Sequence, residues 1–324
     1  MRTIVATAAI LLALPGILAS SALANEGNRV VATIKPLHSL VAGVMLGVGT
    51  PELLIPGTTS PHAFTLKPSD ARKLENARVV FWIGPDLETA LEAPLKTLAD
   101  EGRVETMMRA PGIVHRAYAD GHEHGHDDAH GHKEEHKKDE KDHGDHAGHD
   151  HHGEDDPHIW LDPENARAMV ALIAAVLTDA MPEHADKFAS NRAKLEAELG
   201  SLTDEVSAIL KPVWFKPFLT FHDAFGHFEK RFGLSSGEAI SLNPEVKPGA
   251  KRIAELRAEI KEDGFACVFI EPQFNPAIAE VIVEGTGTHI ATLDPLGSHL
   301  EAGPAMYVAL VREIAKTLRD CMER

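Results

Sequence analysis

Short apolar runs rich in β-branched residues alternate with helical patterns along the first half of the chain. The predicted strands are residues 30–34, 51–56 and 79–83, and the predicted helices are residues 37–46 and 68–74. Pro68 opens the second of these helices with Asp70 in its first turn, which is typical of a helix start. Alternation of this kind predicts parallel strands joined by crossover helices.

The second half of the chain repeats the alternation. The predicted strands are residues 217–221, 237–241, 266–270 and 289–293, and the predicted helices are residues 224–232, 250–261, 276–284 and 306–321. Within one helix, Ile253, Leu256 and Ile260 recur at spacings of three and four residues, which places them on one face. Each half is therefore expected to form an α/β lobe, a Rossmann-like parallel sheet with flanking helices.

A long helical pattern lies between the two halves, at residues 182–210. Its apolar residues recur on a 3.6-residue period and are Phe188, Leu195, Leu199, Leu202, Val206 and Ile209. About 29 helical residues would span about 43 Å, at about 1.5 Å per residue. This length predicts a rigid helix that joins an N-terminal lobe, residues 25–181, to a C-terminal lobe, residues 211–324.

The first 24 residues have the features of a secretory signal peptide. Arg2 is followed by a mostly apolar stretch at residues 4–18, and Ala22-Leu23-Ala24 matches a small-residue cleavage signal. A membrane anchor is the alternative, but a proline–glycine pair interrupts the apolar stretch. No later segment has the roughly 18 uninterrupted apolar residues that span a bilayer. We expect cleavage after about Ala24 and an exported, soluble protein.

One segment of the chain is dominated by histidine and acidic residues. Residues 115–152 hold twelve histidines, and residues 120–156 hold fourteen aspartates or glutamates against four lysines. Having almost no large apolar residues, this tract at about 115–156 cannot bury a core, and we expect it to be disordered without metal. Its irregular spacing and interior position argue against an engineered tag. Imidazoles mixed with carboxylates bind Zn²⁺, Cu²⁺ or Ni²⁺ in many arrangements.

Charge and cysteine content narrow the functional classes. The formal net charge of the 324 residues is −17, which excludes a nucleic-acid partner because a phosphate backbone requires a basic surface. The two cysteines are Cys267, in a predicted strand, and Cys321, at the end of the last predicted helix. In an oxidising compartment such a pair is expected to form a disulfide. A pair of metal thiolates is the alternative, but the cysteines lack C-x-x-C spacing.

Three histidines outside the tract follow strand ends or lie in segments dense with turn residues. They are His62 in Ser60-Pro61-His62, His158 after Asp156-Pro157, and His222 at the end of an apolar strand. Loops at the carboxyl edge of a parallel sheet converge where open α/β folds bind ligands. A single histidine of this kind is usually structural, but three in a chain with a histidine-rich tract predict a metal site. His227, five residues after His222 on a predicted helix, is expected to point elsewhere.

Several longer motifs carry a resemblance to a known family. They are Ile34-Lys35-Pro36, Leu66-Lys67-Pro68-Ser69-Asp70, Asp156-Pro157-His158-Ile159-Trp160-Leu161-Asp162-Pro163, Phe221-His222-Asp223-Ala224-Phe225, Asn243-Pro244-Glu245, Pro248-Gly249-Ala250, Glu271-Pro272-Gln273-Phe274 and Leu293-Asp294-Pro295-Leu296-Gly297. With them the whole mature chain resembles the cluster A-I periplasmic metal-binding proteins that serve ABC transporters, and among these the zinc-specific ZnuA type.

The resemblance implies a function and a set of ligands. His62, His158 and His222 match the three zinc histidines of the family, and Asp294 matches an aspartate that completes the site in many relatives. Some relatives have a glutamate directly before the first histidine, where this chain has Pro61. A water or a tract histidine is the alternative fourth ligand. The resemblance also implies a periplasmic, monomeric, non-enzymatic protein that passes Zn²⁺ to an ABC permease, and a Cys267–Cys321 disulfide.

Two other functions fit three histidines around a metal. An exported zinc hydrolase would keep an open position for water and need a general base, for which Glu271 or Asp223 is available. The chain contains no H-E-x-x-H pattern and no further acid–base pair at motif spacing. A metal buffer without a transporter is the other alternative. If neither residue is a base, Asp223 and Glu271 are candidates to orient ligand histidines, or they cap loops.

The tract is expected to gather zinc for the three-histidine site. Deleting residues 121–152 should therefore slow zinc uptake under severe zinc limitation and leave it unchanged in zinc-replete medium, because only scarce zinc needs to be concentrated. Uptake of radioactive zinc by cells that carry the shortened chain tests this. Equal uptake by both chains at the lowest zinc concentration would contradict it.

Overall fold

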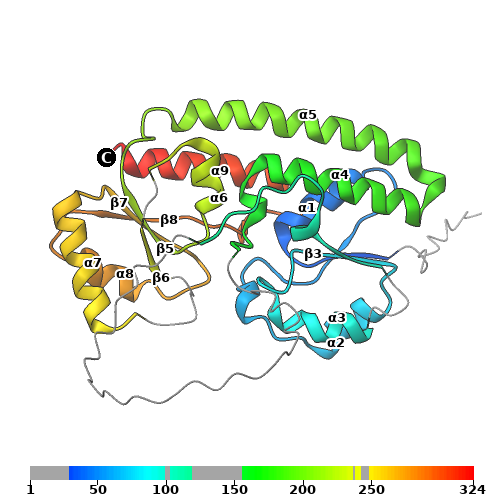
Figure 1. Ribbon diagram of the computed structural model, residues 1–324, viewed down its shortest axis with the longest axis horizontal. Helices are drawn as coiled ribbons and strands as arrows, with labels where there is room; N and C mark the ends of the chain where they lie inside the picture. Colours follow the sequence, from blue (N-terminus) through cyan, green and yellow to red (C-terminus); the bar gives the residue numbers. More distant parts are fainter. Residues whose placement is uncertain (1–28, 99–102, 119–154, 236–237, 242–247) are drawn as a thin grey trace, which may run out of the picture.

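The computed structural model describes residues 29–98, 103–118, 155–235, 238–241 and 248–324 (Figure 1). The predicted signal peptide and most of the histidine-rich tract lie outside these residues. In the part of the chain described, no helix combines the length and the apolar character needed to cross a membrane.

The N-terminal lobe is built on a four-stranded parallel sheet of order β2-β1-β3-β4. Its strands are β1 (Val30–Ala32), β2 (Glu52–Leu53), β3 (Val79–Trp82) and β4 (Arg103–Thr106). Its helices are α1 (Lys35–Val44), α2 (Pro68–Glu75), α3 (Glu92–Leu98) and α4 (Pro163–Ala180). The elements β4, α3 and α4 are not among the predicted ones. The strand β4 has the sequence RVET, so its one aliphatic residue gives no apolar run to recognise.

The C-terminal lobe repeats the architecture with the sheet order β6-β5-β7-β8, again all parallel. Its strands are β5 (Phe218–His222), β6 (Glu238–Ser241), β7 (Cys267–Ile270) and β8 (His289–Thr292). Its helices are α6 (Gly226–Phe232), α7 (Ala250–Asp263), α8 (Ala277–Val283) and α9 (Met306–Met322). The predicted α/β fold with two Rossmann-like lobes is confirmed.

The helix α5 (Ala185–Leu210) runs along both lobes, as the long apolar pattern predicts (Figure 1). It buries Phe188, Leu199 and Val206 completely, whereas Leu210 replaces the predicted Ile209 at the end of the buried stripe. It packs on α4 of the first lobe and on α9 of the second, and α1 also contacts α9. The lobes are therefore joined by one continuous core of helices and not by α5 alone.

The predicted disulfide is present between Cys267 on β7 and Cys321 on α9. Both cysteines are buried, and their Cα atoms lie 6.2 Å apart. Since α9 packs on α5 and α1, the bond fastens the C-terminal sheet to the helices that both lobes share.

Loss of the disulfide should destabilise the protein. The bond closes a loop across 54 residues of sequence, and a crosslink of this span stabilises by limiting the unfolded chain. A Cys267→Ala, Cys321→Ala double variant should lose roughly 2–4 kcal/mol of unfolding free energy. Denaturant unfolding with and without reductant measures the loss. A reductant effect that persists in the double variant would show that the disulfide is not its source.

Candidate metal centre

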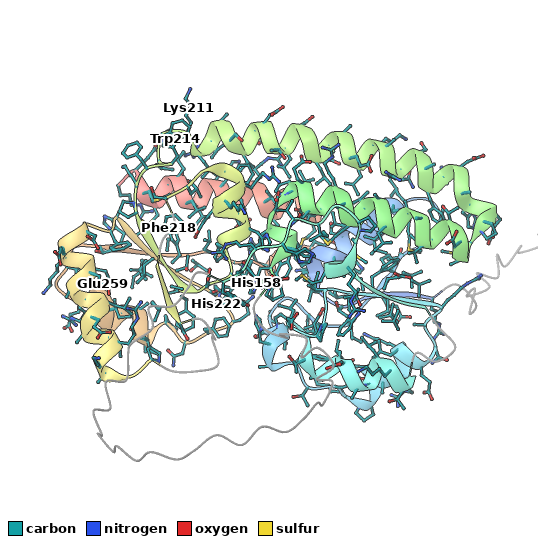
Figure 2. The ribbon with its side chains drawn as sticks, viewed as in Figure 1. His158, Lys211, Trp214, Phe218, His222 and Glu259 are labelled. Atoms are coloured by element: carbon teal, nitrogen blue, oxygen red, sulfur yellow. A yellow bond between two sulfur atoms is a disulfide. The ribbon has the colours of Figure 1, made fainter. Side chains whose placement is uncertain are left out.

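The three predicted histidines come from three separate elements and meet between the lobes. His62 lies in the 3-10 turn Pro61–Ala63, His158 directly precedes the 3-10 turn Ile159–Leu161, and His222 is the last residue of β5. His158 and His222 are buried, while His62 is partly exposed. Figure 2 shows His158 and His222 next to each other at the junction of the lobes, with ring centroids 5.1 Å apart.

The Nε2 atoms of the three rings converge. The Nε2 atom of His158 lies 3.3 Å from that of His62 and 3.3 Å from that of His222. One ligand atom from each of the three residues lies within 4.8 Å of the others. Three Nε2 atoms that face one point suit a single cation. Two imidazole nitrogens bound at about 2.0–2.1 Å to one tetrahedral ion lie roughly 3.3 Å apart, which is the separation seen here.

Two buried carboxylates hold the outer nitrogens of these rings. The Nδ1 atom of His158 donates to Asp156 Oδ1 at 2.7 Å, and Nδ1 of His222 donates to Glu271 Oε1 at 2.5 Å. A carboxylate that accepts the Nδ1 proton selects the tautomer whose Nε2 lone pair is free for a metal. The prediction for Glu271 agrees with this contact, whereas Asp223 lies beside Arg116, at 3.7 Å.

Asp156 is a functional residue that the sequence reasoning missed as a partner of His158. Its Oδ1 atom accepts both the backbone N–H of His158, at 3.0 Å, and the ring N–H, at 2.7 Å. An aspartate two residues before a histidine is placed for this local turn, because the short side chain folds back onto the following backbone. The Asp-Pro-His spacing was the available signal.

Burial keeps the first histidine uncharged. Burial, together with the neighbouring rings of His158 and His222, lowers the pKa of His62 to about 2. For Asp156, burial acts to raise the pKa, but the hydrogen bonds from His158 act against it, and the pKa is lowered. The site therefore presents a neutral imidazole at His62 and an ionised carboxylate behind His158, which is the state that binds a divalent metal.

The space at the centre is small. A cavity of about 10 Å³ lies among residues of both lobes, including the three histidines, Trp160, Glu271 and Phe274. That volume accommodates about one water-sized particle. Pockets for organic ligands are typically about 300–1,000 Å³. The cavity is of a size for an ion and is far smaller than the pockets that usually hold an organic substrate.

Asp294 lies in the loop after β8, outside the group formed by the three histidines. Its Oδ1 atom accepts hydrogen bonds from Leu296 N at 2.9 Å and Gln273 Nε2 at 3.2 Å, and its Oδ2 atom accepts from Ser298 N at 2.5 Å. In this arrangement Asp294 organises its own loop. Its role as a fourth ligand stays a prediction.

The remaining histidines have other surroundings. His227 is buried on α6 and directs Nε2 to the carbonyl of Asp156 at 3.0 Å, away from the three converging nitrogens. His38 is buried with Nε2 3.0 Å from the carbonyl of Pro51. His299 is exposed and pairs with Glu313 at 2.9 Å.

The chain matches known proteins over nearly its whole length. A family model described as zinc-uptake complex component A, periplasmic (ZnuA) matches residues 30–321. The high-affinity zinc uptake system protein ZnuA of Brucella suis biovar 1 (strain 1330) is 45% identical over 315 residues, which cover 94% of each chain. The protein of the same name in Yersinia pestis is 35% identical over 324 residues, which cover 97% of this chain and 95% of that protein.

Solved structures support the same fold. A crystal structure of ZnuA aligns with a TM-score of 0.72 at 23% identity, covering 90% of this chain and 98% of that chain. A zinc-bound ZnuA deletion mutant aligns with a TM-score of 0.71 at 22% identity, covering 91% and 97%.

Removing one converging histidine should affect metal binding far more than removing its buried neighbour. His222→Ala deletes one of three ligands and should weaken Zn²⁺ binding by more than the roughly 100-fold that loss of an outer hydrogen-bond partner can cost. His227→Ala, on the adjacent helix, should weaken it by no more than about tenfold. Calorimetric titration of both purified variants tests the assignment, and equal effects would refute it.

Proposed function

Because the chain belongs to the family of periplasmic zinc-uptake component A proteins, ZnuA, we propose that it captures Zn²⁺ outside the cytoplasm and delivers it to the permease of an ABC transporter. Relatives at 45% and 35% identity carry the name of high-affinity zinc uptake proteins. The protein is a binding component and not an enzyme. We expect the mature chain to start after about Ala24 and to act as a monomer, since every proposed ligand comes from one chain.

The convergence of three Nε2 atoms on one point carries this proposal. His62 and His158 belong to the N-terminal lobe and His222 to the C-terminal lobe. Neutral imidazoles favour Zn²⁺ over Mn²⁺, which prefers oxygen ligands. The carboxylates of Asp156 and Glu271 hold two of the rings in the tautomer that a metal requires. Three imidazoles with this support form a zinc site that needs one further ligand.

The fourth position is open to Asp294 or to water. Asp294 would have to give up hydrogen bonds from Leu296 or Ser298 to turn toward the metal. Each such bond to a buried carboxylate is worth roughly 1.5–3 kcal/mol, so the turn has a real cost. A water can take the position without that cost. A tract histidine remains the third option. Of the twelve, His115 pairs with Asp155 at 3.2 Å, and the other eleven lie outside the described residues.

The two competing functions have less support. A hydrolase would need space for its substrate beside the metal, and the cavity among the histidines is about 10 Å³. A metal buffer would need no transporter, but the named relatives are components of uptake systems. Delivery requires that the ion can leave, and His62, on a three-residue turn and partly exposed, is the ligand whose movement would release it most easily.

Zinc content and zinc-limited growth together test the function. The purified full chain should retain about one Zn²⁺ against a chelator that strips the weaker tract sites, because only the buried site combines three fixed imidazoles. Cells that lack their own zinc-uptake binding protein should grow under zinc limitation with this chain and not with the His62→Ala, His158→Ala, His222→Ala variant. Tight binding without restored growth would favour the buffer, and no tight site would end the proposal.

The Asp294→Ala variant separates the candidates for the fourth position. If water completes the site, affinity for Zn²⁺ should fall less than in any of the three histidine variants, since the substitution then disturbs only the loop after β8. Chelator competition on the four single variants makes the comparison. A loss as large as that of His158→Ala would identify Asp294 as a full ligand.

A further inference from the structure

The guanidinium group of Arg116 lies near the sequence neighbours of two proposed ligand histidines, His158 and His222, which come from different lobes. The side chain of Arg116 is 15% exposed and approaches Asp156, two residues before His158, and Asp223, directly after His222. We propose that Arg116 is a positioning residue of the metal centre, which holds the Asp156 carboxylate and, through it, the ring of His158. This inference rests on the proposed function, since it names what keeps one of the zinc ligands in place.

The two carboxylate oxygens of Asp156 accept hydrogen bonds from different residues. Oδ1 accepts the ring and backbone N–H groups of His158, and Oδ2 accepts Nη1 of Arg116 at 2.9 Å. A carboxylate held at both oxygens cannot rotate about its last bond without breaking one of these contacts. Arg116 therefore fixes the plane in which Asp156 meets the imidazole of His158.

Arg116 also supplies the charge that this buried carboxylate requires. Asp156 is fully buried, and an ionised carboxylate without a cation partner is costly in such a place. Burial, with the charges of Asp223 and Asp156, raises the pKa of the neighbouring Glu229 to about 8, which favours its neutral form near pH 7. The guanidinium is then shared by Asp156 and Asp223.

The C-terminal lobe holds the guanidinium against a glycine. A Cβ atom built on Gly226, the first residue of α6, would lie 2.0 Å from both Cζ and Nη1 of Arg116. The guanidinium therefore occupies the space that any side chain at position 226 would fill. Because it is the far end of a flexible side chain, an added methyl group would displace it with little effect on the backbone.

The backbone of Arg116 is anchored independently of its side chain. Its carbonyl accepts the N–H of Asp156 at 2.7 Å, and the adjacent Ala117 forms an antiparallel bridge with Asp155. Truncating the side chain should therefore leave the segment in position. The effect of a substitution then reports on the guanidinium itself.

A second arginine–aspartate pair between the lobes provides the matched control. Arg231 on α6 donates to Asp162 through Nε at 2.6 Å and Nη2 at 2.8 Å. Asp162 caps α4 by accepting the N–H of Glu164, and within the described parts of the chain it forms no hydrogen bond to His62, His158 or His222. Losing this pair tests what a broken contact between the lobes does on its own.

The experiment compares Arg116→Gln, Gly226→Ala and Arg231→Gln in the full chain. Zinc affinity is measured by competition with a chelator matched to the tight site, and folding is checked by circular dichroism. Arg116→Gln and Gly226→Ala should each weaken binding roughly three- to tenfold, below the 10- to 100-fold typical of a direct partner of a ligand. Arg231→Gln should change affinity by less than about twofold. Gly226→Ala is the more specific test, because it keeps the positive charge of Arg116 and only displaces its guanidinium group.

A double-mutant cycle shows whether Arg116 acts through Asp156. In an Asp156→Asn background, Arg116→Gln should cause no further loss, because the carboxylate it positions is absent. Co²⁺-loaded protein adds a spectroscopic readout: the visible bands, which depend on ligand geometry, should shift in Arg116→Gln and Gly226→Ala and not in Arg231→Gln.

Three results would overturn the proposal. They are unchanged affinity in Arg116→Gln, an undiminished further loss in the Asp156→Asn background, and an equal loss in Arg231→Gln. Wild-type protein and His158→Ala are measured alongside. If wild type lacks a tight zinc site, or His158→Ala keeps it, the proposed function fails and not the assignment of Arg116 alone.

Discussion

Three imidazole lone pairs directed at one point are the feature on which the rest of the structure depends. Neighbouring lone pairs repel one another, so a hydrogen bond at the outer nitrogen of a ring helps to keep its Nε2 atom in place. Asp156 and Glu271 do this for His158 and His222 by accepting their Nδ1 protons. The carboxylates are buried with the rings, so the low-dielectric surroundings strengthen both bonds.

The shared helical core keeps the three histidines from the two lobes in register. α1, α4, α5 and α9 pack together behind both sheets, and the Cys267–Cys321 bond fastens one sheet to them (Figure 1). Hydrogen bonds between the lobes add to this: Trp160 Nε1 donates to the carbonyl of Pro295 at 2.9 Å, and Lys35 Nζ donates to that of Gly297 at 2.7 Å. A pair of lobes joined over so much surface favours release by movement of a loop over wide separation of the lobes.

The geometry of the site also distinguishes a zinc-binding transport protein from a zinc hydrolase. Three histidines and an open position are also the plan of catalytic zinc sites, so the ligand set alone does not distinguish the two. The residues around the three histidines distinguish them. Trp160, Phe274 and the loop after β8 line the space between the rings and leave a cavity of about 10 Å³. Glu271, the candidate base of a hydrolase, is occupied with the Nδ1 proton of His222.

Local sequence patterns predicted most of the secondary structure and the three histidines of the site. Apolar runs and helical spacing predicted most strands and helices, and the positions of His62, His158 and His222 at strand ends or turns predicted that they meet, because parallel strands end at one edge. Only the tertiary structure decided which carboxylates accept the Nδ1 protons of these rings. It showed that Glu271 supports His222 and that Arg116 reaches Gly226, since these contacts join segments far apart in the sequence. The support of His158 by Asp156 and the bonds of Asp294 within its own loop are local, and the structure showed which of their atoms meet. The polar edge strand β4 was missed for a related reason: its pairing with β3, and not its own composition, makes it a strand.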